Sequence, residues 1–220
     1  MANENQQFEI LTEVLERFHE KGILDRLTLI GSWCIYFYNI HFKEKVSSSE
    51  LRTRDSDFLV SKYEKFPQKV DIPALLEDLG FIVELRGQNG FMTLQHPELF
   101  VEFLVPETGS ETDKPFTIPS LSVKANKLNH LQMLLRDPIT VKYHHLNIRV
   151  PNPADFAIHK LIISEIRKNK DKRKKDFLQG SDIYRYLISN GDQESIDKSI
   201  EHLTTKEKKY FNRALEKFTK

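Results

Sequence analysis

Three short apolar runs, each bounded by turn-forming residues, constrain the fold of this chain more than any other feature. They span residues 81–85, 91–95 and 100–105, and each has the length and composition of a β-strand. Residues 87–90, Gly-Gln-Asn-Gly, predict a hairpin turn between the first two runs. Earlier in the chain, apolar residues recur at helical spacing over residues 8–18. Strands that interleave with helices predict an α/β (α+β) fold with a mixed β-sheet flanked by helices.

The second half of the chain changes character after residues 106–119, a segment with Gly, Ser, Thr and Pro that we interpret as a linker. One further pair of strands is expected between residues 140 and 150. From Pro153, which occupies a position favoured in the first turn of a helix, helical patterns dominate. We therefore predict a sheet-containing domain over residues 1–118 and a mainly helical domain over residues 119–220.

Composition narrows the class of protein. Of the 220 residues, 39% are hydrophobic and 30% are charged, with a net charge of +1, which is ordinary for a globular protein. No apolar run approaches the ~20 residues of a membrane span, and residues 1–7 lack the apolar core of a signal peptide. The single cysteine, Cys34, follows Trp33 in an apolar stretch, and we interpret it as a packing residue. These features favour a cytoplasmic protein with no membrane partner.

Acidic residues stand at two places where strands are expected. Asp55 and Asp57 lead into the apolar segment 58–60, and residues two apart share one face of a strand. Glu102 lies inside the apolar run 100–105, and charged residues are seldom buried without a partner. The alternatives are a solvated loop acid or a cap for Asp55 and an edge-strand glutamate facing water for Glu102. If the two strands are neighbours, the three acids converge.

A converging set of carboxylates calls for a cation. Two like charges ~4 Å apart repel by about 4 kcal/mol at an effective dielectric of 20. Mg²⁺ is a hard ion that prefers oxygen ligands and would remove this repulsion. Two such ions can clamp the attacking and leaving oxygens in the transfer of a phosphoryl or nucleotidyl group.

Gly31 and Ser32 stand between a short apolar strand over residues 27–30 and a helical pattern over residues 32–40. The N-terminus of a helix presents free N–H groups and a partial positive charge, and therefore favours phosphate. Glycine permits a close approach of the backbone, and the serine hydroxyl adds a donor. The alternative is a plain strand-to-helix turn with Ser32 as its cap, and the dipeptide by itself favours that alternative.

Two basic features lie in the helical half. Lys160 stands among apolar residues such as Ile158, so it is either a snorkelling lysine or one paired with a ligand. Between Arg167 and Lys175 there are seven basic residues and one acid, Asp171. The run is either a solvated helix end that suits the negative C-terminal dipole or a surface that attracts a triphosphate or a nucleic-acid backbone.

Five segments of the chain carry a family resemblance, and they lie in order over roughly residues 8 to 190. They are Gly31-Ser32, 52–59 with Asp-Ser-Asp-Phe, 101–106, 150–162 with Ala-Ile-His-Lys-Leu, and 175–179 with Lys-Asp-Phe-Leu-Gln. With them the chain resembles the DNA-polymerase-β-like nucleotidyltransferase superfamily, and within it a bacterial family labelled as nucleotidyltransferase domain proteins.

The resemblance implies a role for each matching residue in the first half. Gly31 and Ser32 would hold the β- and γ-phosphates of a nucleotide. Asp55 and Asp57 would bind both metal ions. Glu102 would complete the metal site and help to activate the acceptor hydroxyl.

In the helical half, the resemblance implies that Lys160, Lys175 and Asp176 line the nucleotide pocket. The implied reaction moves a nucleoside monophosphate from an NTP to an acceptor hydroxyl and releases pyrophosphate, with Mg²⁺ or Mn²⁺. The acceptor could be an RNA such as tRNA, a protein or a small molecule. The alternatives are a toxin-like enzyme that modifies tRNA, which the basic run motivates, and a binding module that holds a nucleotide without chemistry.

Overall fold

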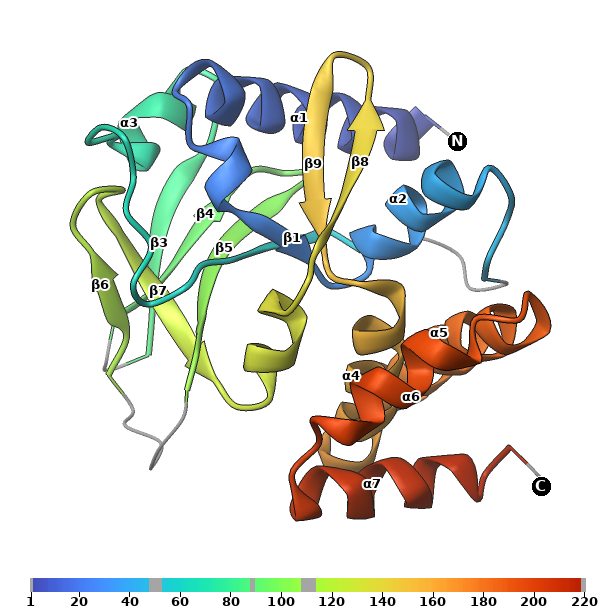
Figure 1. Ribbon diagram of the computed structural model, residues 1–220. Helices are drawn as coiled ribbons and strands as arrows, with labels where there is room; N and C mark the ends of the chain where they lie inside the picture. The colour runs from blue at the N-terminus through green and yellow to red at the C-terminus, as the bar shows by residue number, and fades with distance from the viewer. Residues whose placement is uncertain (1, 48–52, 88–89, 108–113, 219–220) are drawn as a thin grey trace.

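The fold centres on one mixed sheet of seven strands (Figure 1). The computed structural model describes residues 2–47, 53–87, 90–107 and 114–218. The main path of the sheet runs β1 (Thr28–Ile30), β2 (Asp55–Leu59), β5 (Phe100–Pro106), β4 (Phe91–Gln95) and β3 (Ile82–Arg86). Two further strands continue it: β7 (Val123–Leu128) pairs with the end of β5, and β6 (Phe116–Ile118) pairs with β7.

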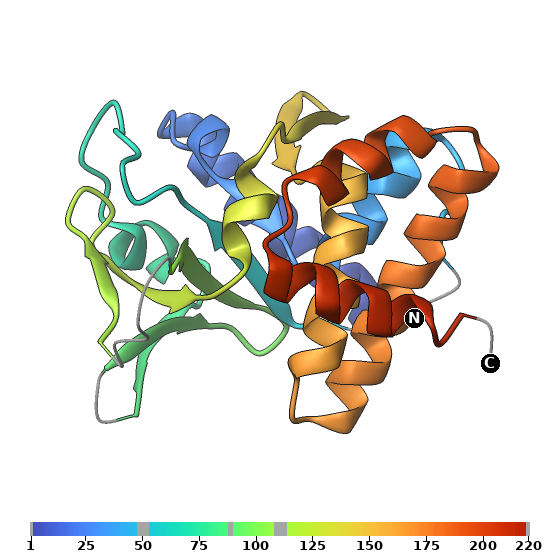
Figure 2. The same cartoon turned by 60° about the horizontal axis from the view of Figure 1, so that its bottom comes forward.

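The helices divide between the two halves of the chain. The first half contributes α1 (Ala2–Glu20), η1 (Leu24–Arg26), α2 (Trp33–Phe42) and α3 (Ile72–Glu77). The second half adds η2 (Leu131–Leu135), the β8 (Ile139–Tyr143) and β9 (Leu146–Val150) hairpin, and then α4 (Pro153–Ile166), α5 (Lys170–Ser189), α6 (Gln193–Glu201) and α7 (Thr205–Leu215). Figure 2 shows α4 to α7 gathered on one side of the sheet. The predicted mixed α/β class is confirmed.

Local sequence signals account for several element boundaries. Gly22 follows α1 with φ +64°, a left-handed conformation that glycine adopts without strain. Asn152 caps α4 by accepting a hydrogen bond from the backbone N–H of Ala154, and Pro153 occupies the first turn, as predicted. The expected hairpin between residues 81 and 95 is present as the antiparallel pair β3 and β4, although residues 88–89 of its turn lie outside the described part.

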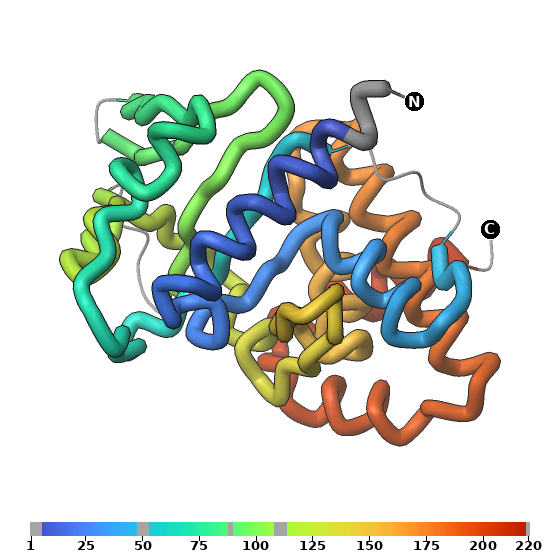
Figure 3. Tube along the Cα trace, turned by 90° about the horizontal axis from the view of Figure 1, so that it is seen from above, coloured from blue at the N-terminus to red at the C-terminus, as the bar shows by residue number. Residues whose placement is uncertain are grey.

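One face of the sheet carries the larger hydrophobic core. Phe58 of β2 and Phe103 of β5 stack with their ring centroids 5.9 Å apart. Phe18 of α1 meets the Phe58 ring edge-on at 5.2 Å. All three are buried, and Figure 3 shows α1 lying across these strands. Because side chains alternate along β2 and β5, this packing turns Asp55, Asp57 and Glu102 to the opposite face.

The opposite face packs partly against the helical half. A second core joins Ile30, Leu59 and Leu104 of the sheet to η2, α4 and α7. The sheet also extends past the boundary expected at residue 118, because β7 pairs with β5. The division into 1–118 and 119–220 as domains stays a prediction. Among the described helices, none combines the length and apolar character that a membrane crossing requires.

Candidate active site

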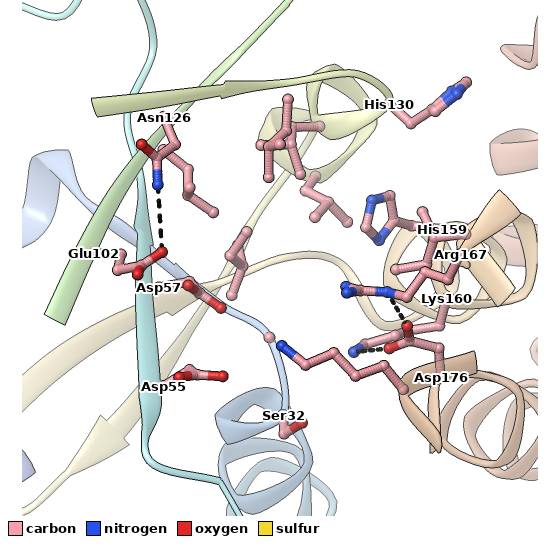
Figure 4. Close-up of a pocket in the computed structure, with 18 of the residues that line it drawn as sticks. Ser32, Asp55, Asp57, Glu102, Asn126, His130, His159, Lys160, Arg167 and Asp176 are labelled. Atoms are coloured by element: carbon pink, nitrogen blue, oxygen red, sulfur yellow. Dashed lines mark hydrogen bonds and ion pairs between the residues drawn. The ribbon is translucent and has the colours of Figure 1, made fainter. Parts of the chain in front are cut away.

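Three carboxylates share one face of two neighbouring strands. β2 and β5 pair in parallel, with Asp57 opposite Glu102 and Asp55 two residues earlier on the same face (Figure 4). Asp55 and Asp57 are both strand residues, so the interpretation of Asp55 as a loop acid or cap is wrong. The edge-strand interpretation of Glu102 is also wrong, since β5 has β2 on one side and β4 and β7 on the other.

Glu102 is held in place by two further strands. The Thr93 hydroxyl of β4 donates a hydrogen bond to one oxygen of Glu102 at 2.8 Å. The Asn126 side-chain amide of β7 donates to the other oxygen at 3.4 Å. The sequence alone did not indicate either residue, because their proximity to Glu102 depends on strand pairings between distant segments. We call the five side chains Asp55, Asp57, Glu102, Thr93 and Asn126 the sheet wall.

The Asp57 carboxyl stands in an electrostatically unfavourable position. Burial, followed by repulsion from Glu102 and Asp55, raises its pKa to about 7, against weaker attraction from Lys160 and Arg167. Among the described residues, none of the three carboxylates of the sheet wall forms an ion pair. The negative charge of this wall is therefore largely uncompensated.

The turn between β1 and α2 abuts the Asp57 carboxylate. Gly31 has φ +80°, and a Cβ at this position would lie 2.8 Å from Oδ2 of Asp57. A side chain at this position would be disfavoured both by the left-handed backbone conformation and by the lack of space beside Asp57. Ser32 is the N-cap of α2, but its hydroxyl makes no capping hydrogen bond. It donates instead to Oε1 of the buried Gln179 on α5, at 3.4 Å.

The opposite side of the site comes from α4 and α5. Lys160 and Asp176 are both buried, and Nζ of Lys160 lies 2.7 Å from Oδ1 of Asp176. Nε of Arg167 lies 2.5 Å from the other oxygen of Asp176. Lys160 is thus neither snorkelling nor free, because it belongs to a buried ion-pair network. We call Lys160, Arg167, Lys175 and Asp176 the helical wall.

The basic run between Arg167 and Lys175 bends from one helix into the next. Arg167 is the C-cap of α4, whereas Lys170 begins α5. The alternative of a solvated C-terminal helix end is therefore wrong for five of the seven basic residues, which occupy the first turns of α5. Cations there oppose the helix dipole, so helix stability does not explain them. Burial and the charge of Lys160 lower the pKa of Lys175.

One cavity of about 740 Å³ separates the two walls. All eight residues singled out from the sequence line it: Gly31, Ser32, Asp55, Asp57, Glu102, Lys160, Lys175 and Asp176. The same cavity is lined by further residues that the sequence analysis did not single out, notably Thr93, Asn126, His130 and His159. His159 could have been noticed, because it adds a second polar residue beside Lys160 in an otherwise apolar stretch.

The sheet wall can be tested as a site for a divalent metal. Within the described part of the chain, no three acidic, imidazole or thiol groups are drawn together tightly enough to enclose an ion as they stand. The donor chemistry nevertheless fits, because three carboxylates face one cavity and the half-buried Asp57 lacks a compensating cation. The residues present therefore fit a hard cation such as Mg²⁺.

A mixed sheet whose acids face a basic helical wall across a cavity is an arrangement suited to nucleotide chemistry. Comparison with known families agrees. The chain matches the model of a nucleotidyltransferase family over residues 9–204 and belongs to that family.

A solved structure shows the same fold. The crystal structure of ANT(2″)-Ia in complex with adenylyl-2″-tobramycin superposes with a TM-score of 0.51 at 11% identity, covering 94% of this chain and 98% of the other. A nucleotidyltransferase-like protein from Paracoccidioides brasiliensis gives a TM-score of 0.46 at 11% identity, covering 95% and 88%. No curated protein sequence matches the chain significantly.

Proposed function

We propose that this protein transfers a nucleoside monophosphate from an NTP to an acceptor hydroxyl, with Mg²⁺ or Mn²⁺ as cofactor and pyrophosphate as product. The observation that supports it most is the single cavity, in which three uncompensated carboxylates face a wall of basic side chains. A nucleotide with its metal carries both charges that such a cavity requires. The location that goes with this proposal is the cytoplasm.

The reaction makes one bond and breaks one. The oxygen of the acceptor hydroxyl forms a bond to the α-phosphorus of the NTP, and the bond from that phosphorus to the oxygen bridging the β-phosphate breaks. The bonding electron pair leaves with pyrophosphate, and the hydroxyl proton passes to a base. Glu102 is the base in this proposal, because Thr93 and Asn126 hold its carboxylate at the cavity surface.

The other residues bind and position the nucleotide. Gly31 and Ser32 receive the β- and γ-phosphates at the N-terminus of α2, where the helix dipole favours negative charge and the Ser32 hydroxyl makes no capping hydrogen bond. Lys160 and Lys175 neutralise phosphate charge from the helical wall, with Asp176 holding Lys160 in position. Positioning and charge neutralisation are the main contributions a protein makes to such transfers.

Asp55, Asp57 and Glu102 are the residues that would hold the metal. When bound, a divalent cation neutralises the charge that develops on the phosphate oxygens. Burial, followed by repulsion from Glu102 and Asp55, raises the pKa of Asp57, and a bound cation would offset both effects.

The proposal is tested with Asp57→Asn, which removes the charge and keeps the shape. Wild-type protein, incubated with Mg²⁺ or Mn²⁺, labelled NTPs and a cell extract as acceptor pool, should attach label to an acceptor, and the variant should attach on the order of 10³-fold less. Asp197→Asn, on the exposed surface of α6, is the matched control. Equal labelling by Asp57→Asn and wild type would overturn the proposal, and a mass shift on the acceptor would identify it.

One observation favours an RNA acceptor such as tRNA, which a toxin-like enzyme would modify. Five basic residues occupy the first turns of α5, and Lys172 and Lys175 among them line the cavity. A polyanion could follow this surface into the site. The affinity for tRNA should then fall steeply between 50 and 200 mM salt, and a shallow dependence would favour a protein or small-molecule acceptor. A small molecule is the kind of acceptor in the ANT(2″)-Ia complex, whose ligand is adenylyl-2″-tobramycin.

The alternative of a non-catalytic nucleotide-binding module makes a different prediction. A module that only binds has no need to keep three carboxylates that repel one another. Calorimetry with each NTP separates the two, because an enzyme of the proposed kind needs the metal for tight binding. Equal affinity with and without Mg²⁺, together with no labelled acceptor, would favour the module.

A further inference from the structure

His159 is a buried polar residue to which the proposed reaction gives no role. Its side chain is 6% exposed and lines the cavity from α4 (Figure 4). Neither ring nitrogen has a hydrogen-bond partner among the described residues. The nearby His130 is not its partner, because Nδ1 of His130 lies 2.8 Å from a carboxylate oxygen of Glu207.

The His159 imidazole is neutral. Burial, followed by the charges of Lys160, His130 and Arg167, lowers its pKa to about 3, against weaker attraction from Glu207. A neutral imidazole carries one N–H donor and one acceptor nitrogen. Both lack a hydrogen-bond partner among the described residues, and burying them in this state costs free energy that an apolar side chain of the same size would not.

Helix α4 presents two different stripes to the cavity. Lys160 and Arg167 form a charged stripe, with Asp176 beside them. Residues 159, 163 and 166 share a second face at helical spacing, and all three line the cavity. Ile163 and Ile166 are apolar, and His159 is the polar exception. Phe156, which also lines the cavity, belongs with the charged stripe, because Nζ of Lys160 lies 5.5 Å from the centre of its ring.

Helix η2 adds further apolar surface to the same part of the cavity. Leu131 and Leu134 both line the cavity, and both belong to the core that η2 forms with α4. Apolar walls around one hydrogen-bonding group suit a planar heteroaromatic ring, whose faces are apolar and whose edge carries donors and acceptors. A phosphate could use the hydrogen-bonding group but not the apolar walls, and an alkyl chain could use the apolar walls but not the hydrogen-bonding group.

We propose that the apolar part of the cavity, between η2 and the stripe of α4 formed by His159, Ile163 and Ile166, receives the base of the NTP, and that His159 hydrogen-bonds to the base edge and determines base specificity. This inference rests on the proposed nucleotidyl transfer. The two stripes of α4 then divide one ligand between them. The charged stripe takes the phosphates, and the stripe with His159 takes the base.

Two variants and one control test this role. His159→Leu removes both nitrogens at similar volume, and His159→Asn keeps an amide that can donate and accept. His202→Leu, at the exposed end of α6, is the matched control. Calorimetry in Mg²⁺, without acceptor, gives the affinities for ATP, GTP, CTP and UTP and for inorganic tripolyphosphate, which has no base. Thermal unfolding of each variant reports whether it is folded.

We expect wild type to prefer one NTP, and His159→Leu to lower the ratio of its best to its worst NTP affinity about tenfold. Tripolyphosphate affinity should stay within about twofold, and His159→Asn should keep most of the ratio. The inference is overturned if His159→Leu keeps the ratio, or if it weakens tripolyphosphate as much as the NTPs. Wild type that binds no NTP would overturn the proposed function as well, whereas wild type that binds all four NTPs equally would overturn only the base-reading role.

Discussion

The two walls of the cavity carry opposite charges and are built in opposite ways. The sheet wall presents Asp55, Asp57 and Glu102 with no ion pair among the described residues, and the pKa of Asp57 rises to about 7. The helical wall pairs Asp176 with both Lys160 and Arg167. The sheet wall therefore costs folding free energy until a cation arrives, whereas in the helical wall the buried Asp176 carboxylate is compensated by two cations.

The walls also differ in what fixes their geometry. Backbone pairing of β2 with β5 sets the positions of Asp57 and Glu102, so single substitutions there leave the frame intact. The helical wall depends on side chains and on the close approach of α4 and α5. Substitutions in the helical wall should therefore affect stability most, and those in the sheet wall should mainly affect activity.

The largest effect is expected from Lys160→Met, which removes one partner of a buried ion pair. Asp176 is only 4% exposed, and it would keep a single cationic partner. Such a loss costs about 3–5 kcal/mol, because a buried charge is left poorly compensated. Urea unfolding of variant and wild type measures the difference in the free energy of unfolding.

The control is the double variant Lys160→Met with Asp176→Leu. Replacing a buried pair by apolar residues is often neutral, so much of the lost stability should return. A single variant that loses less than about 1 kcal/mol would show that the helical wall is not compensated in the way described.

A second effect is expected from Gly180→Ala, at the crossing of α4 and α5. An added Cβ would lie 2.9 Å from the Ala157 carbonyl oxygen and 3.0 Å from Cβ of Lys160. The helices must move apart, at a cost of about 1–3 kcal/mol, although alanine has the higher helix propensity. Thermal or urea unfolding measures it, with Lys174→Ala on the exposed face of α5 as control. A more stable Gly180→Ala protein would contradict the close packing.

The sheet wall could be predicted further than the helical wall. Side-chain alternation is local, so the sequence already indicated that Asp55 and Asp57 share a face, and that Glu102 joins them if the two strands are neighbours. What it lacked was β7. The stretch Val-Lys-Ala-Asn-Lys-Leu over residues 123–128 has weak strand character and followed a segment interpreted as a linker. Its place beside β5 follows from tertiary pairing, and Asn126 was missed with it.

For the helical wall, the sequence could predict the residues but not their contacts. The sequence marked Lys160, Lys175 and Asp176 through a resemblance, but it could not show that Lys160 and Asp176 meet. The two residues are sixteen positions apart in the chain, and their contact depends on how α4 crosses α5. Gln179 was missed for the same reason, because its role depends on the Ser32 hydroxyl that it meets from a distant segment.

A third, smaller effect on stability is expected from Asp57→Asn. The substitution should raise the free energy of unfolding although it lowers the activity. In metal-free protein at pH 8, the variant should gain about 0.5–2 kcal/mol, since it removes a charge that burial and its neighbours disfavour. The folded-state pKa of about 7 lies above the usual 3.8. Wild type therefore regains stability as pH falls from 7 towards 3.8, and the gain should be smaller at pH 5. Urea unfolding at both pH values measures this, and a less stable variant at pH 8 would contradict the uncompensated charge.

The smallest expected effect is on the pH dependence of stability. His159, on the helical side of the cavity, lowers the free energy of unfolding as the pH falls, whereas Asp57 raises it. The pKa of His159 is about 3 in the folded protein and 6.5 when unperturbed. The unfolded chain takes up a proton first, so this contribution to stability is present above pH 6.5 and is lost as pH falls towards 3. Between pH 7.5 and 5.5, wild type should lose about 1 kcal/mol relative to His159→Leu, which has no such group. Glu207, whose pKa hydrogen bonding from His130 lowers to about 2, adds its own loss only below pH 4.5, so urea unfolding above pH 5 isolates the histidine. Parallel pH profiles for wild type and His159→Leu would mean that His159 is not held neutral in the folded protein.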